Sequence, residues 1–215
     1  MMAITHELKT PISVARLNLE TLQKYNLDEE KKQKIIRTTL DETSRLDFLT
    51  NNILVAAQLE NSNFKAEKEE LDLTALLKDC IRQFNNRFPE RIFVEDIEYD
   101  TDIKGDSLLL QMLINNLLEN ATKYSPKESP ISTILKRTKV GIELQIKDQG
   151  IGIEETEKAK IFNKFYRIGS EATRKTKGTG LGLYLCRKIA RDHNGDITMT
   201  KNEPQGSIFA VTFKS

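Results

Sequence analysis

The sequence predicts an α+β protein, in which a two-helix hairpin that dimerises into a four-helix bundle precedes an α/β sandwich. Two observations support this prediction. Apolar residues recur three and four positions apart through residues 1–60, which is typical of amphipathic helices packed in a bundle. From residue 71 onward, helical stretches are mixed with short strands of alternating polarity, which indicates helices on one face of a mixed sheet. We therefore expect a helical domain over 1–62, a linker over 63–70 and a second domain over 71–215.

The first helix is expected to end near Lys24, and Asp28 is a suitable N-cap for a second helix from Glu29 to about Glu60. A single hairpin exposes too much apolar surface to be stable alone, whereas two hairpins bury both stripes in a four-helix bundle. We therefore predict a homodimer. The alternative, in which the hairpin packs on the rest of its own chain, is less favoured because the stripe is long. The stripe residues are Ile4, Leu8, Ile12, Ala15, Leu19 and Leu22, then Ile35, Ile36, Leu40, Leu46, Leu49, Ile53, Ala56 and Ala57.

The second domain is expected to mix helices with strands, which we assign from the period of the apolar residues. Helices are predicted over 71–88, 107–123 and 181–193. Strands are predicted over 91–99, 101–104, 131–137, 140–148, 196–201 and 207–213. The strands over 131–137 and 140–148 form a hairpin.

Composition excludes several classes of function. The chain has 33 basic and 32 acidic residues and a formal net charge of +1, so it lacks the charge of a nucleic-acid-binding or polybasic membrane surface. Cys80 and Cys186 have no metal-ligand spacing, so we interpret them as reduced core residues of a cytoplasmic protein. No apolar run approaches the roughly 20 residues that a membrane span needs. His193 ends a predicted helix before a glycine, which favours a structural role.

His6, the other histidine, has a more informative position. It lies two residues from both Ile4 and Leu8, so at about 100° per residue it faces water rather than the apolar stripe. An imidazole on an exposed, rigid helix is a nucleophile available to a partner. Glu7 is adjacent and can accept or orient the imidazole proton. Thr10 is one helical turn further on, where its hydroxyl can lie beside the imidazole.

A pair of asparagines in the second domain suits a metal and phosphates. Asn116 and Asn120 are four residues apart, so both amides project from one face of a helix. Their neutral oxygens suit a hydrated Mg²⁺ that also binds phosphate oxygens. Lys123 is three residues past Asn120 and reaches the same phosphates. Taken alone, such a pair is more often a solvated helix face.

Asp148 directly follows a predicted strand and can accept a hydrogen bond from the exocyclic amine of adenine. Gly150 and Gly152 follow it and allow a flat ligand to approach the backbone. Further along, an aromatic segment over 161–166 is followed by Arg167, a cation that can meet a phosphate. Together these residues predict a second part of a nucleotide site.

A glycine-rich loop then runs into the predicted helix that begins at residue 181. Backbone N–H groups and the N-terminus of a helix favour phosphate binding. The spacing excludes a Walker A sequence and a convincing Rossmann fingerprint. The polar and basic residues 168–177 would act as a lid. The residues of this loop are Lys177, Gly178, Thr179, Gly180, Leu181 and Gly182.

The octapeptide Thr5–Ile12, which contains His6, resembles the H-box of sensor histidine kinases. The other four segments resemble, in order and type, the N, G1, F and G2 boxes of the histidine-kinase catalytic domain, which is an ATPase of the Hsp90 and gyrase type. The resemblance covers nearly all 215 residues. It implies that His6 takes the γ-phosphoryl group of ATP with the assistance of Glu7. It further implies that Thr10 places water when the kinase dephosphorylates its partner.

The resemblance also implies the other roles and partners. Asn116, Asn120 and Lys123 would serve Mg²⁺ and phosphates, with Tyr124 close by, and Asp148 would read adenine. The glycines of the loop would shape a lid hinge and a phosphate site. The phosphoryl group would pass to an aspartate of a response-regulator receiver domain, as part of a bacterial two-component signal-transduction system. Such kinases usually carry an upstream sensor, so the chain is expected to be the cytoplasmic portion of a membrane-anchored protein.

Kinase is favoured over ATP hydrolase by one residue. The hydrolysing relatives place a water-activating Glu four residues before the metal-binding Asn, and here that position is Asn116. Two alternatives remain open. One is a dimeric binding module with a vestigial nucleotide site, and the other is an ATPase clamp of the gyrase or Hsp90 kind.

Overall fold

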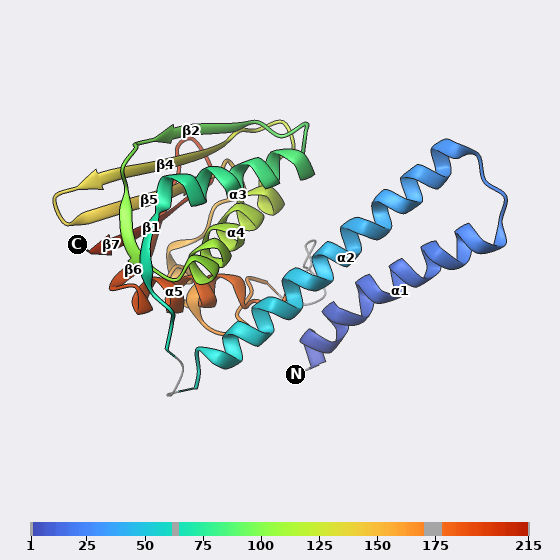
Figure 1. Cartoon of the computed structure of the whole chain (residues 1–215), viewed down its shortest axis with the longest axis horizontal. Helices are drawn as coiled ribbons and strands as arrows, with labels where there is room; N and C mark the ends of the chain where they lie inside the picture. The colour runs from blue at the N-terminus through green and yellow to red at the C-terminus, as the bar shows by residue number, and fades with distance from the viewer. Residues whose placement is uncertain (1, 62–64, 170–177, 215) are drawn as a thin grey trace.

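The structure is a computed structural model that describes residues 2–61, 65–169 and 178–214, with side chains from Thr5 onward (Figure 1). Its helices are α1 (Met2–Lys24), α2 (Glu29–Gln58), α3 (Leu73–Arg87), α4 (Ser107–Tyr124) and α5 (Gly182–Asp192). Its strands are β1 (Glu69–Asp72), β2 (Phe93–Ile97), β3 (Asp102–Gly105), β4 (Ile131–Thr138), β5 (Gly141–Lys147), β6 (Gly195–Lys201) and β7 (Ser207–Lys214). Two 3₁₀ turns, η1 (Glu155–Glu157) and η2 (Lys160–Phe162), lie between β5 and α5.

The helical hairpin forms as predicted, with α1 and α2 antiparallel (Figure 1). The Asp28 side chain accepts a hydrogen bond of 2.9 Å from the Lys31 N–H, which caps α2 where the sequence predicted. The Asn18 amide donates to the Thr39 hydroxyl at 3.1 Å and links the two helices. No described helix is both long enough and apolar enough to span a membrane.

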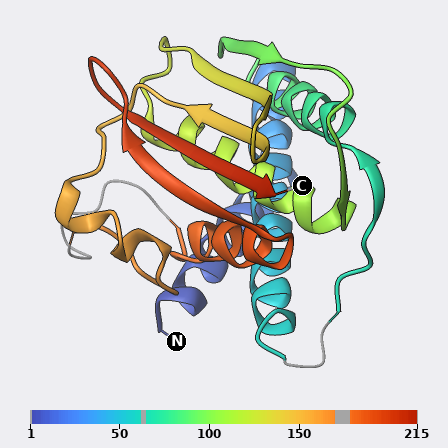
Figure 2. The same cartoon turned by 90° about the vertical axis from the view of Figure 1, so that its left-hand side faces the viewer.

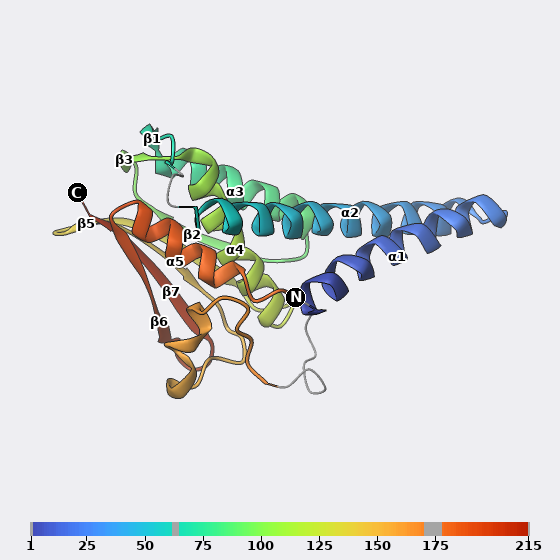
Figure 3. The same cartoon turned by 90° about the horizontal axis from the view of Figure 1, so that it is seen from below.

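The second domain is an α/β sandwich on a mixed sheet, which confirms the predicted fold class. The five strands lie in the order β2-β4-β5-β7-β6, with β2 and β4 parallel and all other neighbours antiparallel. Helices α3, α4 and α5 cover one face of the sheet (Figure 2). Figure 3 shows this helix layer lying between the sheet and α2. The core between helices and sheet contains Leu113 and Leu117 of α4 and Ile146 of β5, each no more than 1% exposed.

One strand was not predicted. β1 pairs with β3 in a separate two-stranded antiparallel sheet, with Leu71 opposite Ile103. The sequence predicts a helix from Leu71, but α3 begins at Leu73, after Asp72, whose side chain caps it by accepting from the Ala75 N–H at 3.0 Å. The prediction failed because β1 is mostly exposed and charged, so it has no alternation of apolar residues to detect.

Part of the α2 stripe packs on the chain's own second domain, the alternative that the sequence analysis favoured less. Leu49 is 5% exposed, and Ala56 joins the core of the second domain at 3% exposed. After the end of α2, Glu60 accepts hydrogen bonds from Lys164 at 2.6 Å and from the Tyr184 hydroxyl at 3.0 Å. Other residues of the stripe are exposed, among them Ile12, Leu19, Ile36 and Leu40.

Cys80 and Cys186 are free and buried in the second domain, as predicted. Burial raises the pKa of the Cys80 thiol to about 12 and also raises the pKa of Cys186. Neither thiol is therefore ionised near neutral pH.

Candidate functional site

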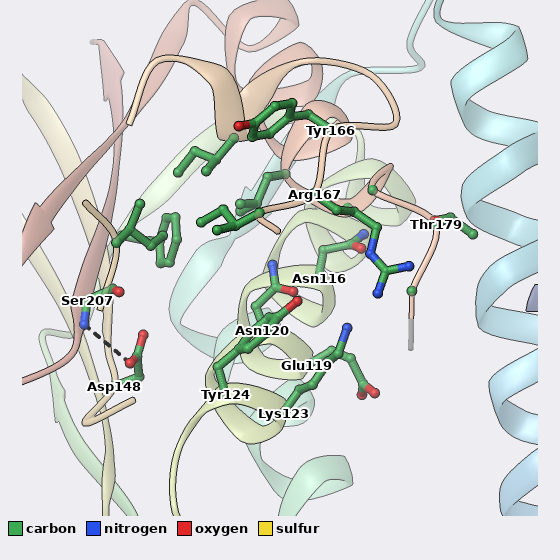
Figure 4. Close-up of a pocket in the computed structure, with 18 of the residues that line it drawn as sticks. Asn116, Glu119, Asn120, Lys123, Tyr124, Asp148, Tyr166, Arg167, Thr179 and Ser207 are labelled. Carbon is green, nitrogen blue, oxygen red and sulfur yellow. Dashed lines mark hydrogen bonds between the residues drawn. The ribbon is translucent and has the colours of Figure 1, made fainter. Parts of the chain in front are cut away.

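A cavity of about 490 Å³ lies between α4, the start of α5 and α2 (Figure 4). Its volume is within the range of about 300–1,000 Å³ that small-molecule sites occupy. It brings together all four of the separated segments that the sequence predicted to bind a nucleotide. The predicted residues that line it are Asn116, Asn120, Lys123, Tyr124, Asp148, Gly152, Arg167, Gly178, Thr179, Gly180 and Gly182.

Asp148 lies at one end of the cavity, directly after β5, and is 5% exposed. Its Oδ1 accepts a hydrogen bond from the backbone N–H of Gly150 at 2.8 Å. The same oxygen accepts from the backbone N–H of Ser207 at 3.2 Å (Figure 4). Burial raises the pKa of this carboxyl. Because both backbone bonds hold the same oxygen, the other oxygen can accept a hydrogen bond from a ligand amine.

The other part of the cavity carries the cations. Lys123 projects from α4, with its Nζ 4.8 Å from the centre of the Tyr124 ring. A Cβ built on Gly178 would lie 2.9 Å from the Lys123 Nζ, so the glycine loop passes close to this ammonium group. Arg167, which lies in the segment between η2 and the glycine loop, also lines the cavity (Figure 4). This arrangement suits the negative charges of a triphosphate.

The glycine loop is shaped by close backbone contacts. Gly180 has a φ of +72°, and its carbonyl accepts from the Phe165 N–H at 3.0 Å, which ties the loop to the aromatic segment. A side chain at Gly182 would lie 2.6 Å from the Asn116 Oδ1, so only glycine lets α5 begin this close to α4. The first turn of α5 therefore presents its backbone N–H groups beside the cavity.

Two residues predicted for the nucleotide site do not line the cavity, and a third is not described. Gly150 lies behind Asp148 and holds it through the backbone. Leu181 is 1% exposed and belongs to the core, with its N–H donating to the Thr179 hydroxyl at 3.3 Å. Lys177 lies outside the described residues, as does most of the predicted lid.

The residues of the cavity fit a Mg²⁺ ion held by amide oxygens rather than by a cluster of carboxylates. Among the described residues no group of three or more His, Cys, Asp and Glu side chains could hold a metal ion. The carboxamides of Asn116 and Asn120 lie on the cavity side of α4 (Figure 4). Mg²⁺ commonly retains waters and binds few protein oxygens alongside phosphates, which such a pair would allow.

His6 is exposed on α1, as predicted from its phase on the helix. Its neighbour Glu7 is only 8% exposed and lies between two guanidinium groups. The Arg45 Nη2 is 2.9 Å from the Glu7 Oε2, and the Arg167 Nη1 is 3.5 Å from its Oε1. The Thr10 hydroxyl donates to the His6 carbonyl at 3.1 Å. The nucleotide cavity and the histidine helix therefore share Arg167.

Residues of α2 at the cavity were missed by the sequence analysis. Arg45 and Asn52 both line it, and Asn52 bonds to Asn116. Arg45 gave no signal, because charged residues are ordinary on a helix. Asn52 did give one, since it occupies the apolar stripe between Leu49 and Ala56, where an amide needs a buried partner.

His193 has the structural role that its position indicated. Its Nδ1 lies 2.8 Å from the Ile189 carbonyl, and its Nε2 accepts from the Asp106 N–H at 2.9 Å. These partners require a proton on Nδ1 alone, and burial lowers the pKa of the imidazole. The ring is therefore neutral and joins the end of α5 to the start of α4.

Comparison with known proteins identifies the family. Residues 105–215 match the model of the histidine kinase-, DNA gyrase B- and HSP90-like ATPases. The chain belongs to this ATPase family. Residues 1–62 match the model of the His Kinase A (phospho-acceptor) domain, so this ATPase domain follows a phospho-acceptor domain, the composition of a histidine kinase core. The predicted resemblance is thereby confirmed.

The chain is similar over almost its whole length to curated sensor protein kinases. The chain is 30% identical over 213 residues to a sensor protein kinase WalK from Staphylococcus aureus, and the alignment covers 97% of this chain and 51% of that protein. The alignment with the WalK of the JH9 strain covers only 35% of that protein. The chain thus spans about half the length, or less, of the curated relatives it matches.

Solved structures show the same fold. The Acinetobacter baumannii histidine kinase AdeS has a TM-score of 0.70 at 22% identity, with 97% of each chain covered. The catalytic domain of the histidine kinase ThkA has a TM-score of 0.62 at 26% identity, with 69% of this chain and 95% of that chain covered. The ATPase domain and its helical hairpin both have counterparts of known structure.

Proposed function

We propose that the chain is an ATP-dependent protein-histidine kinase that phosphorylates His6 and passes the phosphoryl group to an aspartate of a response regulator. One observation carries the proposal: Arg167 reaches from the nucleotide cavity to Glu7, the neighbour of the exposed His6. A pocket for ATP and an acceptor imidazole are thus linked within one chain. The family models that match the two domains support this activity.

The proposed roles follow from the cavity's chemistry. The free oxygen of Asp148 accepts the adenine amine, while Lys123, Arg167 and the first turn of α5 hold the phosphates. Mg²⁺ bound through the amides of Asn120 and Asn116 would neutralise phosphate charge. Phosphoryl transfer depends mainly on such positioning and charge neutralisation, so the cavity needs no further covalent group.

The acceptor side requires a movement. His6 does not line the cavity, so the ATPase domain must shift to bring the γ-phosphate to the imidazole. A His6 ring nitrogen then forms the bond to phosphorus as the bond to the ADP oxygen breaks, and Glu7 takes the imidazole proton. Arg167 leaves Glu7 for the phosphates, while Arg45 keeps hold of the Glu7 carboxylate.

Further parts of the proposal concern partners. Exposed Ile12, Leu19, Leu40 and Leu54 supply an apolar surface for a second hairpin, which supports a homodimer with a four-helix bundle. The receiver domain of the regulator would bind this bundle beside His6. Thr10, one turn along α1, supports the reverse reaction, in which the kinase dephosphorylates that regulator. Its need for ATP and its reduced cysteines favour action in the cytoplasm.

Incubation with γ-labelled ATP and Mg²⁺ tests the kinase activity. We expect an acid-labile, base-stable label on the wild-type chain that is lost in His6→Ala and Asn120→Ala. Lys9→Ala, an exposed change on the same helix as His6, is the matched control and should keep the label. A label that survives His6→Ala would contradict the assigned acceptor. Phosphate release without His6 would favour the ATPase clamp, and tight ATP binding without any label would favour the binding module.

A further inference from the structure

We propose that Asn52 of α2 competes with magnesium-bound nucleotide for the Asn116 amide, so that nucleotide binding and packing of the hairpin on the ATPase domain oppose each other. This inference rests on the proposed ATP site and adds to it a hairpin residue that controls access to a metal-binding amide.

The amides of Asn52 and Asn116 form a reciprocal pair. The Asn52 Nδ2 donates to the Asn116 Oδ1 at 3.2 Å, and the Asn116 Nδ2 donates to the Asn52 Oδ1 at 3.0 Å. Each residue is 2% exposed. The pair joins α2 to α4, and is therefore a contact between the hairpin and the ATPase domain.

The second N–H of the Asn116 amide also has a hydrogen-bond partner. Its Nδ2 donates to the Met112 carbonyl at 2.9 Å, so both of its N–H groups have acceptors. Its Oδ1 accepts from Asn52 on one side and lies against Gly182 of α5 on another. While the pair persists, Asn52 occupies one of the two acceptor positions of this oxygen, on the side from which α2 packs against α4.

The apolar surroundings of Asn52 make the amide pair specific for one position of α2 on the ATPase domain. Leu49 and Ala56 are buried on the same face of α2, one turn before Asn52 and one turn after it. A buried amide in an apolar contact is costly unless it is paired, so a shift of α2 along α4 would leave both amides unsatisfied. The pair thus selects one register of packing between α2 and the ATPase domain, as a single buried Asn does between helices.

Competition for one amide couples the two equilibria. A ligand that needs the Asn116 oxygen binds only after Asn52 has withdrawn, which lowers its apparent affinity. Linkage is reciprocal, so the same ligand weakens the packing of α2 by the same factor. A ligand without metal, such as ADP in excess chelator, makes no demand on this oxygen and is not coupled.

Binding measurements on Asn52→Ala and Asn52→Leu test the inference, with Asn51→Ala as matched control because Asn51 is exposed on the same helix. The probes are a non-hydrolysable ATP analogue with Mg²⁺ and ADP in excess chelator. We expect both Asn52 variants to bind the magnesium-bound analogue roughly tenfold more tightly, which corresponds to the loss of one buried amide pair. Binding of metal-free ADP should stay within about twofold, and Asn51→Ala should match the wild type. Leu keeps the apolar volume, so agreement between the two variants excludes an effect of a cavity.

Hydrogen exchange gives a second measurement without nucleotide. Amides of α2 around Asn52 should exchange faster in both variants than in the wild type, and magnesium-bound analogue should accelerate them in the wild type. Unchanged or weaker binding of this analogue by the variants, with normal wild-type binding, would overturn the inference alone. A wild-type chain that binds no nucleotide would overturn the proposed function as well.

Discussion

The Arg167 guanidinium lies 3.5 Å from the Glu7 carboxylate and joins the ATPase domain to the helix that carries His6. Both side chains are largely buried, at 15% and 10% exposed, so solvent and salt screen this pair less than a surface ion pair. Arg167 also lines the nucleotide cavity. One cation is therefore positioned to respond to both the nucleotide and the neighbour of the acceptor.

Replacement of Arg167 tests whether this cation contributes to phosphoryl transfer. For Arg167→Ala we expect the rate of His6 phosphorylation to fall about 10- to 100-fold, because a cation that meets the phosphates is lost. The rate is measured with labelled ATP at saturation. Arg191→Ala, in which the lost side chain is exposed and pairs with Asp196, should behave as wild type. A normal rate in Arg167→Ala would argue against any contact with the phosphates.

Arg45 is expected to act as a positioning residue for Glu7. Arg45→Met should reduce phosphorylation about tenfold, because the Glu7 carboxylate loses the guanidinium group that holds it beside His6. Arg45→Lys should restore part of the rate, and Arg37→Met, an exposed change on α2, is the control. A rate in Arg45→Lys that is no higher than the rate in Arg45→Met would contradict a role for the positive charge at this position.

Asp148→Asn should weaken nucleotide binding without loss of stability. Burial raises the pKa of Asp148 in the folded state above its pKa in the unfolded chain. The folded protein therefore loses stability as the pH rises from the unfolded-state pKa, and the ionised carboxylate lowers the free energy of unfolding at neutral pH. The neutral amide can still accept from Gly150 and Ser207, so we expect an unchanged or 2–4 °C higher Tm (about 1 kcal/mol). ATP affinity should fall roughly 10- to 100-fold, because an adenine amine loses its charged acceptor. Calorimetry gives both values, and a lower Tm would contradict the burial argument.

His193 should make stability depend on pH. Burial lowers the pKa of the folded-state imidazole, so below about pH 6.5 the unfolded chain binds a proton that the folded chain does not. The contribution of His193 to the free energy of unfolding is therefore complete above about pH 6.5 and declines as the pH falls below that value. His193→Ala should cost about 2–4 kcal/mol at pH 7.5, from lost packing and an unsatisfied Asp106 N–H. Urea unfolding at pH 7.5, 6.5 and 5.5 should show the gap between variant and wild type narrowing. A constant gap would mean that the imidazole can be charged in the folded state.

Leu40→Glu tests the dimer. Leu40 is 62% exposed on α2, and a charge there would be buried unpaired between two hairpins. We expect light scattering to find a monomer, whereas Thr38→Glu, also exposed on α2, should remain a dimer. A Leu40→Glu dimer of wild-type affinity would exclude this face as the interface.

The predictable features were those with a local sequence signal. The spacing of Asn116 and Asn120, and the position of Asp148 after a strand, placed them correctly at one cavity. β1 was missed because its charged residues have no alternation, and the pairing that forms it involves a distant strand. Arg45 was missed because its partner depends on how two domains pack, which no period in a single helix reports. Asn52 could have been found as an amide within the apolar stripe of α2, although the stripe does not reveal its partner.

Burial of Cys80 and Cys186 has a practical consequence for experiments. The sequence contains only these two cysteines, and neither is accessible or ionised near neutral pH in the folded chain. A cysteine introduced at Thr50, which is exposed on α2, would therefore be the residue that reacts with a maleimide dye. A second one at the exposed Lys139 would allow the separation of the hairpin from the ATPase domain to be followed by energy transfer, with both native thiols left in place.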